Sequence, residues 1–267
     1  MQKITMLGTG MGSVMDLYNT CFVIQNDKGS FLVDTGGSIE ILKRLKMINI
    51  NLEDIHHIFI SHNHTDHILG FIWMLKKIGV YALNGKIKDR INVYCNDVVY
   101  ESIKAIYSHT LPQKFINEFL KVIDFHVLSD NEQIEINGIN YTFFDINAKS
   151  TKQYGFECFL NGKRLVFLGD ETMNPILNER VRGADYVMHE AFCLDSEENI
   201  FHAYQKNHST VKSASEALNQ LDVKNIILYH TEESHEDQRK KLYIQEAKEN
   251  FDGNVIVPND LEIIEIN

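Results

Sequence analysis

The sequence predicts an α/β (α+β) protein in which two β-sheets pack together with helices outside, a four-layer αββα sandwich. Signals for strands and helices alternate along most of the chain, and a run of antiparallel strands lies near its middle. Mixed strands with helices interspersed in both halves are accommodated by two packed sheets. Linkers rich in Pro, Ser or low-complexity sequence do not occur. We therefore expect a single domain spanning 1–267.

In the first part of the chain, short apolar runs bounded by turn residues predict strands at 4–7, 21–25, 31–33, 55–60 and 91–94. Asn26-Asp27-Lys28-Gly29 is a good hairpin turn between the second and third of them. Apolar residues at helical spacing predict helices at 39–47, 70–78, from 96 or 97 to about 107, and near 112–120. Ser38 is a suitable cap for the first helix.

In the second part, antiparallel strands are predicted at 133–136, 140–144, 155–160 and 164–167. Asn137-Gly138 and Asn161-Gly162 separate them, and such pairs are the strongest short hairpin signals. The final third alternates again, with strands at 186–188, 225–229, 255–257 and 261–266 and helices at 209–220 and 235–250. The topology is therefore expected to mix hairpins with helical crossovers.

Composition narrows the function. The net charge of −11 argues against a sequence-independent electrostatic grip on nucleic acid, and 44% hydrophobic residues suffice for a large core. The four cysteines lie far apart without a CxxC pair, which indicates buried reduced thiols. The amino terminus reaches Gly8 before a signal-peptide core could form, and no apolar stretch approaches a membrane span. A cytoplasmic location without membrane partners is expected.

The densest chemical feature is a cluster of three histidines and a carboxylate after the apolar run 55–60, in Ser61-His62-Asn63-His64-Thr65-Asp66-His67. In an extended chain, His62 and His64 point to the same side and can converge on one cation. Asp66 and His67 can then reach a second cation nearby. Imidazole and carboxylate donors suit Zn²⁺, with Mn²⁺ or Fe²⁺ as alternatives, and two adjacent cations suit hydrolysis. The alternative interpretation is a chance cluster of solvated histidines.

Further donors follow other strand-like runs. Asp170 and His230 each close such a run, and a carboxylate at 170 could bridge two cations. Glu190 could accept the ring N–H of His208, which would make that histidine a proton donor to a leaving oxygen. Asp34 is expected to accept the N–H of one metal-bound imidazole. Taken singly, each has a bland alternative, such as an ordinary turn, a helix cap or a buried polar pair.

Seven segments, taken in order, resemble the metallo-β-lactamase superfamily, and most closely the branch of the tRNA 3′-end endonuclease RNase Z and related phosphodiesterases. They are Leu7–Gly10, Leu32–Gly36, Ser61–His67, Gly169–Asp170, His189–Phe192, His208–Thr210 and Tyr229–His230. The glycine-containing segment 7–12 lacks the Lys-Ser/Thr ending of a phosphate loop and is interpreted as a turn at the rim of the site.

The resemblance implies an αβ/βα sandwich with a metal site between the tops of two sheets. One metal would be bound by His62, His64 and a further histidine. The other would be bound by Asp66, His67 and His230, with Asp170 bridging both and a hydroxide between them as the nucleophile. The resemblance also makes Asp66, His208 and Glu190 the candidate catalytic residues, with His208 assisting the leaving group. A homodimer is expected by analogy with the branch.

Two departures from the family pattern matter. The further histidine is expected just before the strand that precedes Gly169-Asp170, but Asn147 or Lys149 occupies that region. An ammonium there would compete with a cation, so the first metal subsite is expected to be weakened, filled differently or empty. His109 and His126 are interpreted as structural. Moreover, 149–170 holds one hairpin where bacterial RNase Z enzymes carry a long arm that grips tRNA.

The sequence therefore predicts a metal-dependent hydrolase of a small-molecule phosphodiester, with Zn²⁺ at up to two sites. Other nucleic acids stay open as substrates, whereas tRNA is disfavoured. One alternative is a lactonase, thioesterase or other carbonyl-ester hydrolase of the same fold. Another is a binding or regulatory module with an incomplete metal site.

Overall fold

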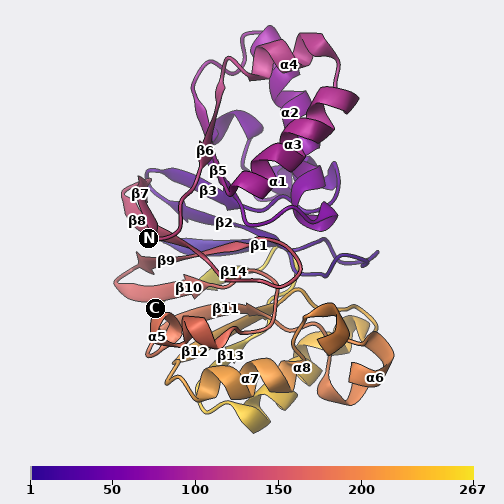
Figure 1. The fold of residues 1–267 in the computed structure, drawn as a ribbon, viewed down its shortest axis with the longest axis vertical. Helices are drawn as coiled ribbons and strands as arrows, with labels where there is room; N and C mark the ends of the chain where they lie inside the picture. Colours follow the sequence, from indigo (N-terminus) through magenta and orange to yellow (C-terminus); the bar gives the residue numbers. More distant parts are fainter. Residues whose placement is uncertain (1) are drawn as a thin grey trace.

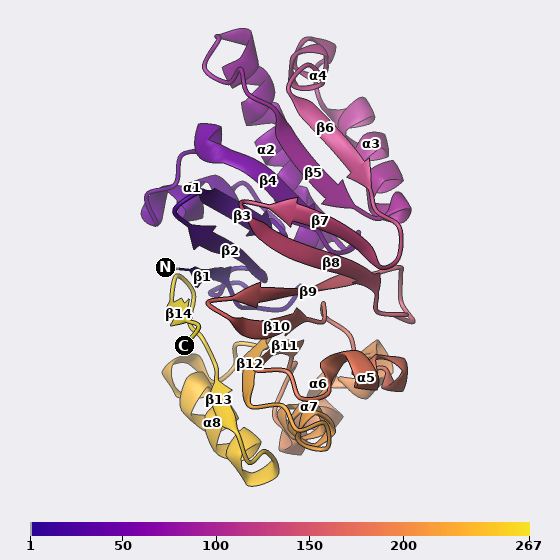
Figure 2. The same cartoon turned by 90° about the vertical axis from the view of Figure 1, so that its left-hand side faces the viewer.

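The computed structural model describes residues 2–267, apart from the side chain of Glu236. Two seven-stranded sheets pack face to face, and helices cover the outer face of each sheet (Figures 1 and 2). The predicted four-layer αββα sandwich is therefore confirmed. None of the described helices is long and apolar enough to cross a membrane.

The amino-terminal sheet has the strand order β14-β1-β2-β3-β4-β5-β6. Its strands are β1 (Lys3–Gly8), β2 (Cys21–Asn26), β3 (Gly29–Val33), β4 (Ile55–Ile60), β5 (Ile91–Cys95), β6 (Ile123–Val127) and β14 (Ile263–Glu265). The pairs from β3 to β6 are parallel, whereas β14, β1, β2 and β3 pair antiparallel. The sequence analysis missed β6, because this edge strand is only partly buried and its apolar pattern is weak.

The second sheet has the order β13-β12-β11-β10-β9-β8-β7. Its strands are β7 (Glu132–Ile136), β8 (Ile139–Asp145), β9 (Tyr154–Leu160), β10 (Lys163–Phe167), β11 (Tyr186–Glu190), β12 (Asn225–Tyr229) and β13 (Asn254–Ile256). The Asn-Gly turns at 137–138 and 161–162 have φ between 50° and 78°, as tight hairpins with two left-handed residues require. The predicted hairpins are confirmed, and β10 to β13 run parallel.

Helices α1 to α4 cover the first sheet and α5 to α8 the second (Figure 1). They are α1 (Glu40–Met47), α2 (Thr65–Leu83), α3 (Asp97–Thr110), α4 (Gln113–Phe119), α5 (Asn178–Val181), α6 (Glu198–Phe201), α7 (Val211–Asn219) and α8 (Arg239–Asn250). Short 3₁₀ turns are η1 (Leu52–Asp54), η2 (Pro175–Leu177), η3 (Asp195–Glu197), η4 (Tyr204–Lys206) and η5 (Glu236–Gln238).

Several predicted boundaries were wrong. α2 was expected at 70–78 but begins at Thr65 and ends at Leu83, so Asp66 and His67 lie in its first turn. The first turn of α2 is polar, so the apolar spacing that predicts a helix begins only after it. α1 begins one residue later than predicted, and the Ser38 hydroxyl accepts a hydrogen bond from Glu40 N at 3.2 Å. α7 also begins later, because Thr210 forms its capping box.

The two sheets are joined by aromatic packing across their inner faces. Phe31 of β3 lies 4.8 Å from Tyr141 of β8, and Phe59 of β4 lies 5.0 Å from Phe143, measured between ring centroids. All four side chains are fully buried. Aromatic pairs at such separations add about 0.5–1.5 kcal/mol each beyond the burial of their surface. This layer sets the position of β3 and β4 relative to the second sheet.

The first turn of α2 packs tightly against the segment after β3. Gly70 N donates to Gly36 O at 2.8 Å, and Thr35 N donates to His67 O at 3.2 Å. A Cβ atom on residue 70 would lie 2.0 Å from Thr35 O. Glycine is therefore required at position 70 for α2 to bring His67 to the strand ends.

We expect Gly70→Ala to destabilise the protein by about 1–3 kcal/mol, because an added methyl group forces the backbone apart. Helix propensity alone predicts the opposite sign, a gain of about 1 kcal/mol. Urea unfolding measures the change, and Lys76→Ala on the exposed face of α2 is the control. Equal or greater stability of Gly70→Ala would contradict the close approach.

Candidate metal centre

The candidate site lies where the carboxyl ends of parallel strands from both sheets meet. Asp34 follows β3 and His62 follows β4, whereas Asp170 and His230 follow β10 and β12 of the other sheet. Parallel neighbouring strands deliver the residues after them to the same edge of a sheet. Side chains that are far apart in sequence are therefore brought together at one place.

One group of donors consists of Asp66, His67, Asp170 and His230, all of them buried. Their ligand atoms lie within 4.8 Å of one another. Asp66 Oδ2 is 3.4 Å from both His67 Nε2 and His230 Nε2. A tetrahedral site with bonds of about 2.0–2.1 Å has donors about 3.3–3.4 Å apart. The group therefore fits a transition-metal cation.

A second group consists of His62, His64 and Asp170, with His64 only half-buried. Asp170 belongs to both groups, because its Oδ2 lies 3.3 Å from His62 Nε2, 3.2 Å from His67 Nε2 and 3.3 Å from His230 Nε2. Asp170 is thus placed where a bridging carboxylate would lie. The second group offers one donor fewer than the first, so the two subsites differ in strength.

Unpartnered atoms test whether this cluster is an ordinary hydrogen-bond network. His62 Nε2, His67 Nε2 and Asp170 Oδ1 are buried and lack any hydrogen-bond partner among the described residues. Buried polar atoms are normally satisfied, because leaving one unsatisfied costs about 1–3 kcal/mol. A cation would satisfy the two imidazole nitrogens, which supports a metal at this place.

The protein also arranges charge for a cation. Burial alone would raise the pKa of Asp66 and Asp170, but the neighbouring histidines outweigh burial and hold the pKa of each carboxyl well below its ordinary value. Burial lowers the pKa of His67, but Asp34, Asp66 and Asp170 more than compensate and raise it. Both carboxylates are therefore ionised at neutral pH, and His67 would have to lose its proton before its ring could hold a cation.

Asp34 holds the ring of His67. Its Oδ2 lies 2.9 Å from His67 Nδ1, and the same carboxylate accepts Ser61 N at 2.8 Å and the Ser61 hydroxyl at 2.7 Å. Asp34 has φ 54°, a left-handed conformation that is strained for a residue other than glycine. The arrangement directs Nε2 of His67 toward Asp170.

The backbone of 169–170 is held by side chains from two other segments. Gly169 has φ 68°, and its carbonyl accepts the hydroxyl of Tyr229. Asp170 N donates to Gln153 Oε1 at 3.3 Å. His230 likewise has φ 57°. Backbone strain of this kind is retained at functional sites when the surrounding contacts enforce it.

The segment 145–151, where the family pattern leads one to expect a further histidine, contributes no donor to either group within the described part of the chain. The side chains of Asn147 and Lys149 are exposed. Buried Glu171 accepts hydrogen bonds from Lys149 N at 2.5 Å and Ser150 N at 3.0 Å, which fixes the backbone of this loop.

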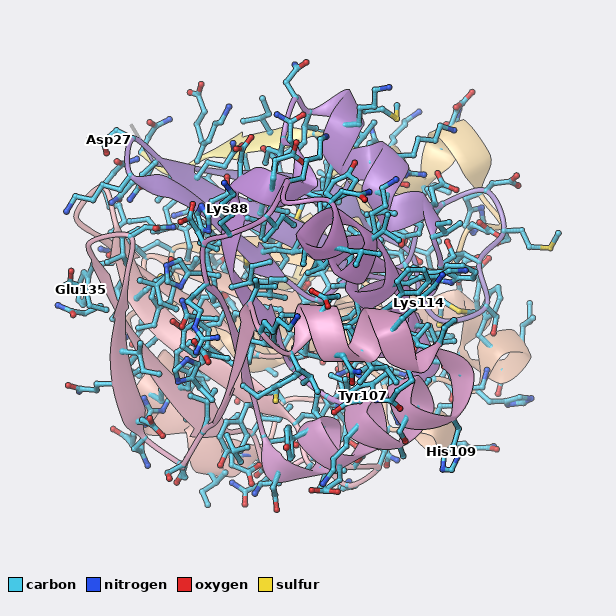
Figure 3. All side chains as sticks on the ribbon, turned by 90° about the horizontal axis from the view of Figure 1, so that it is seen from above. Asp27, Lys88, Tyr107, His109, Lys114 and Glu135 are labelled. Atoms are coloured by element: carbon cyan, nitrogen blue, oxygen red, sulfur yellow. The ribbon has the colours of Figure 1, made fainter. Side chains whose placement is uncertain are left out.

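The two histidines interpreted as structural also lie outside the donor groups. His109 is on α3 and is exposed, at the periphery of the molecule (Figure 3). His126 on β6 bonds through Nε2 to Asn92 Oδ1 at 2.9 Å. Neither joins the cluster of described donors.

His208 and Glu190 lie at the edge of the cluster. The ring of His208 stacks on Phe192 at 4.8 Å and lies 5.1 Å from the ring of His230, between centroids. Its Nδ1 is 3.6 Å from Glu190 Oε2, which is too long for a direct hydrogen bond. Glu190 Oε1 accepts Ser209 N at 2.5 Å. Burial lowers the pKa of His208, but Glu190, Asp170 and Asp66 together raise it above 6.5.

A pocket of about 200 Å³ opens onto the cluster. Besides His64, Asp66, Asp170, His208 and His230, it is lined by Met11, Gly12, Ser13, Phe192 and Lys206. The sequence analysis placed segment 7–12 at the rim but assigned no role to Phe192 or Lys206. Lys206 stands two residues before His208, and this proximity was the available signal.

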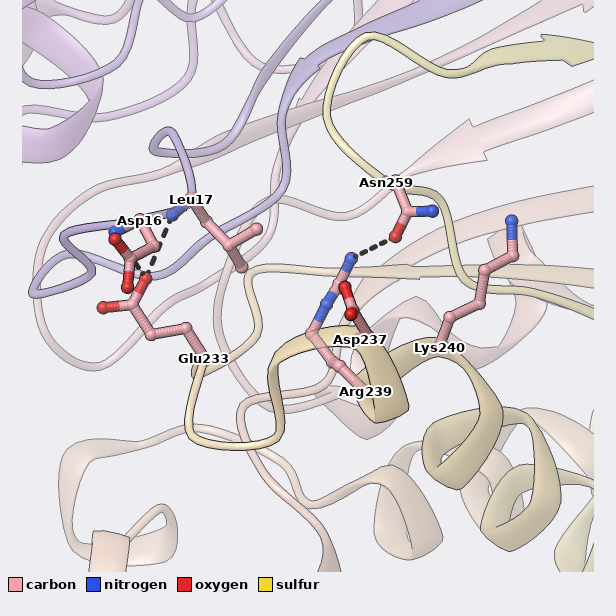
Figure 4. A pocket seen from close by; sticks show the side chains of 7 residues that line it. All are labelled: Asp16, Leu17, Glu233, Asp237, Arg239, Lys240 and Asn259. Atoms are coloured by element: carbon pink, nitrogen blue, oxygen red, sulfur yellow. Dashed lines mark hydrogen bonds between the residues drawn. The ribbon is translucent and has the colours of Figure 1, made fainter.

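A larger cavity of about 480 Å³ lies elsewhere, beside α8 (Figure 4). Its buried Arg239 bonds to Thr231 Oγ1, Pro258 O and Asn259 Oδ1, which are all neutral groups. Glu233 accepts hydrogen bonds from the backbone of 15–17. This cavity lacks the histidine donors of the cluster, so chemistry favours the smaller pocket as the candidate site.

We expect Asp170→Ala to remove most bound metal, because Asp170 belongs to both donor groups. His230→Ala should remove more metal than His64→Ala, since it disrupts the four-donor group. Elemental analysis of the purified variants measures metal per chain, with His109→Ala as the control. Undiminished metal content in Asp170→Ala would refute the bridging assignment.

Comparisons with known proteins identify relatives of this chain. A family profile described as "Anti-Pycsar protein Apyc1" matches residues 2–250. A Ribonuclease Z from Phocaeicola vulgatus is 22% identical over 309 aligned positions, which cover 98% of each chain. The metallo-β-lactamase fold protein YhfI from Bacillus subtilis matches with a TM-score of 0.80 at 17% identity, covering 99% of each chain. A diphosphatase of the PhnP family matches with a TM-score of 0.75 at 18% identity, covering 100% of this chain and 98% of that one.

The family match spans nearly the whole chain, and the relatives agree with the resemblance drawn from the sequence. The chain belongs to the anti-Pycsar protein Apyc1 family and is an RNase Z-like member of the metallo-β-lactamase superfamily of hydrolases.

Proposed function

We propose that this protein is a metal-dependent hydrolase of a small phosphodiester. The position of His208 carries the proposal. It lines the same pocket as Asp66, Asp170 and His230. Its Nδ1 lies 3.6 Å from the carboxylate of Glu190. A phosphodiester has a poor leaving group that benefits from a proton donor beside the attacked phosphorus. Two relatives are by name a ribonuclease and a diphosphatase, which supports cleavage at phosphorus.

In this proposal the metal is held by His62, His64, Asp66, His67, Asp170 and His230. A bound divalent cation would supply water activation at neutral pH and stabilisation of negative charge on the phosphate. Asp34 holds His67 in the required orientation. The cation is Zn²⁺ in this proposal, with Mn²⁺ or Fe²⁺ as alternatives, because the donors are imidazole nitrogen and carboxylate oxygen.

His208 donates a proton to the leaving oxygen. Its ring is held by stacking on Phe192, and the charge of Glu190 at 3.6 Å favours the protonated imidazole. Burial lowers the pKa of His208, but Glu190, Asp170 and Asp66 raise it overall, which favours the protonated form that a proton donor needs. Asp66 orients the metal-binding imidazoles of His67 and His230 by its contacts with them.

Size favours a compact substrate. The pocket of about 200 Å³ is smaller than the usual range of about 300–1,000 Å³ for small-molecule sites. Between Lys149 and Asp170 the chain forms only the β9–β10 hairpin. A phosphodiester closed within one nucleotide fits these limits better than a long RNA, although RNA is retained as a test substrate.

We expect the metal-loaded protein to hydrolyse bis(p-nitrophenyl) phosphate and a nucleoside 3′,5′-cyclic monophosphate faster than a short RNA. A thioester should be a poorer substrate than the cyclic nucleotide, because its thiolate leaves without the proton that His208 supplies to an alkoxide. A lactone should also be poorer, because it carries no anionic phosphate for the proposed site. Product release with Zn²⁺ or Mn²⁺ supplied is measured for each, with Asp170→Asn as the inactive control. Turnover of the lactone or thioester alone would favour the carbonyl-ester alternative.

We expect His208→Gln to lower kcat about 10²–10⁴-fold on a phosphodiester with an alcohol leaving group, because the proton donor is lost. The loss should be much smaller with p-nitrophenolate, which leaves without protonation. Steady-state kinetics on both substrates measure the difference, and His109→Gln is the control. Equal losses on the two substrates would show that His208 does not protonate the leaving group.

A further inference from the structure

Lys206 brings an unpaired positive charge to the pocket. Among the described residues that line it, Lys206 is the sole lysine or arginine. No carboxylate in the described part of the chain lies within ion-pair distance of its ammonium, although many other lysines are paired. A lysine at a pocket wall without a protein partner is free to meet an anion of the ligand.

The backbone fixes Lys206 relative to His208. Lys206 N and His208 N both donate to Ala203 O, at 3.0 and 2.9 Å. Asn207 between them has φ 63°, and its carbonyl accepts Thr172 N at 3.0 Å. This tight turn is therefore attached to the segment that follows Asp170. The base of the lysine side chain keeps a defined position beside the metal cluster.

The ring of Phe192 contacts both the ammonium of Lys206 and the imidazole of His208. The Lys206 Nζ lies 5.1 Å from the centroid of the Phe192 ring, and the same ring stacks on His208. Contact with an aromatic face favours the ammonium there. Lys206 and the proposed proton donor thus share a neighbour at the pocket wall.

The net charge of the molecule makes a positive side chain in the pocket useful for binding an anion. The chain has a net charge of −11, so a negatively charged substrate is repelled at long range. Within the pocket, Asp66 and Asp170 are faced by histidines, which leaves their charge partly compensated. Lys206 is an exposed residue of the pocket wall and contributes a positive charge that can attract an anionic phosphate.

We propose that Lys206 is a substrate-anchoring residue whose ammonium contacts a non-bridging oxygen of the substrate phosphate. The proposal rests on the proposed function and narrows it, since such a contact selects anionic phosphodiesters over neutral esters. Lys206 acts in binding, whereas His208 acts on the leaving group.

The test compares Lys206→Met and Lys206→Arg with Lys88→Met in the metal-loaded protein. Lys88, labelled in Figure 3, is exposed and lies in the loop before the amino end of β5, whereas the site residues follow the carboxyl ends of strands. We expect Lys206→Met to raise KM for bis(p-nitrophenyl) phosphate about tenfold while kcat changes less than about threefold, the size of one lost charge contact. Lys206→Arg should restore most of the affinity, and Lys88→Met should behave as wild type.

Binding without turnover gives an independent measurement. Titration calorimetry with inorganic phosphate should show weaker binding to Lys206→Met, and high salt should weaken binding to wild type more than to the variant. An unchanged KM and an unchanged phosphate affinity would refute the proposal, as would a loss of kcat alone. If wild type hydrolyses no phosphodiester yet phosphate affinity still depends on Lys206, the proposed function fails while the anchoring role stands.

Discussion

The carboxylate of Asp170 is the contact on which the rest of the site depends. One of its oxygens lies 3.2–3.3 Å from imidazole nitrogens of His62, His67 and His230, which come from both sheets. A buried carboxylate is expensive unless opposite charge or hydrogen bonds compensate it. The imidazoles reduce that cost without removing it, because Asp170 Oδ1 has no hydrogen-bond partner in the described part of the chain. Residues from both sheets therefore meet around a buried carboxylate that favours a bound positive charge.

The site is asymmetric, and the cause is local. The four-donor group is built from strand ends and from the first turn of α2, and Gly70 lets that turn approach the backbone of Thr35. The three-donor group receives no donor from the described loop 145–151. The backbone of this loop is hydrogen-bonded to Glu171, and its Lys149 side chain is exposed. In sequence terms this departure is a missing histidine. In the structure it is a loop whose backbone is held by Glu171 and whose Asn147 and Lys149 side chains are exposed.

Comparison of prediction and structure shows which signals are reliable. The hairpins at Asn137-Gly138 and Asn161-Gly162 were predicted correctly, because both residues of such a turn need left-handed conformations. The start of α2 was predicted wrongly, since the donors Asp66 and His67 interrupt the apolar pattern by which a helix is recognised. The edge strand β6 was missed because it is half exposed. Lys206 was overlooked since an isolated lysine carries no pattern.

The αββα fold and the candidate donors were predictable from the sequence, because strand periodicity, turn chemistry and the dense motif at 61–67 are local properties. The superfamily was predictable from the resemblance of seven ordered segments to its pattern. How closely these donors lie to one another is visible in the tertiary structure alone. The shared position of Asp170, the contact of Asp34 with His67 and the gathering of Phe192, Lys206 and His208 around one pocket depend on how parallel strand ends and their loops meet. Asp170 lies more than a hundred positions from His62 and His67 in the chain, and no local pattern encodes their contact.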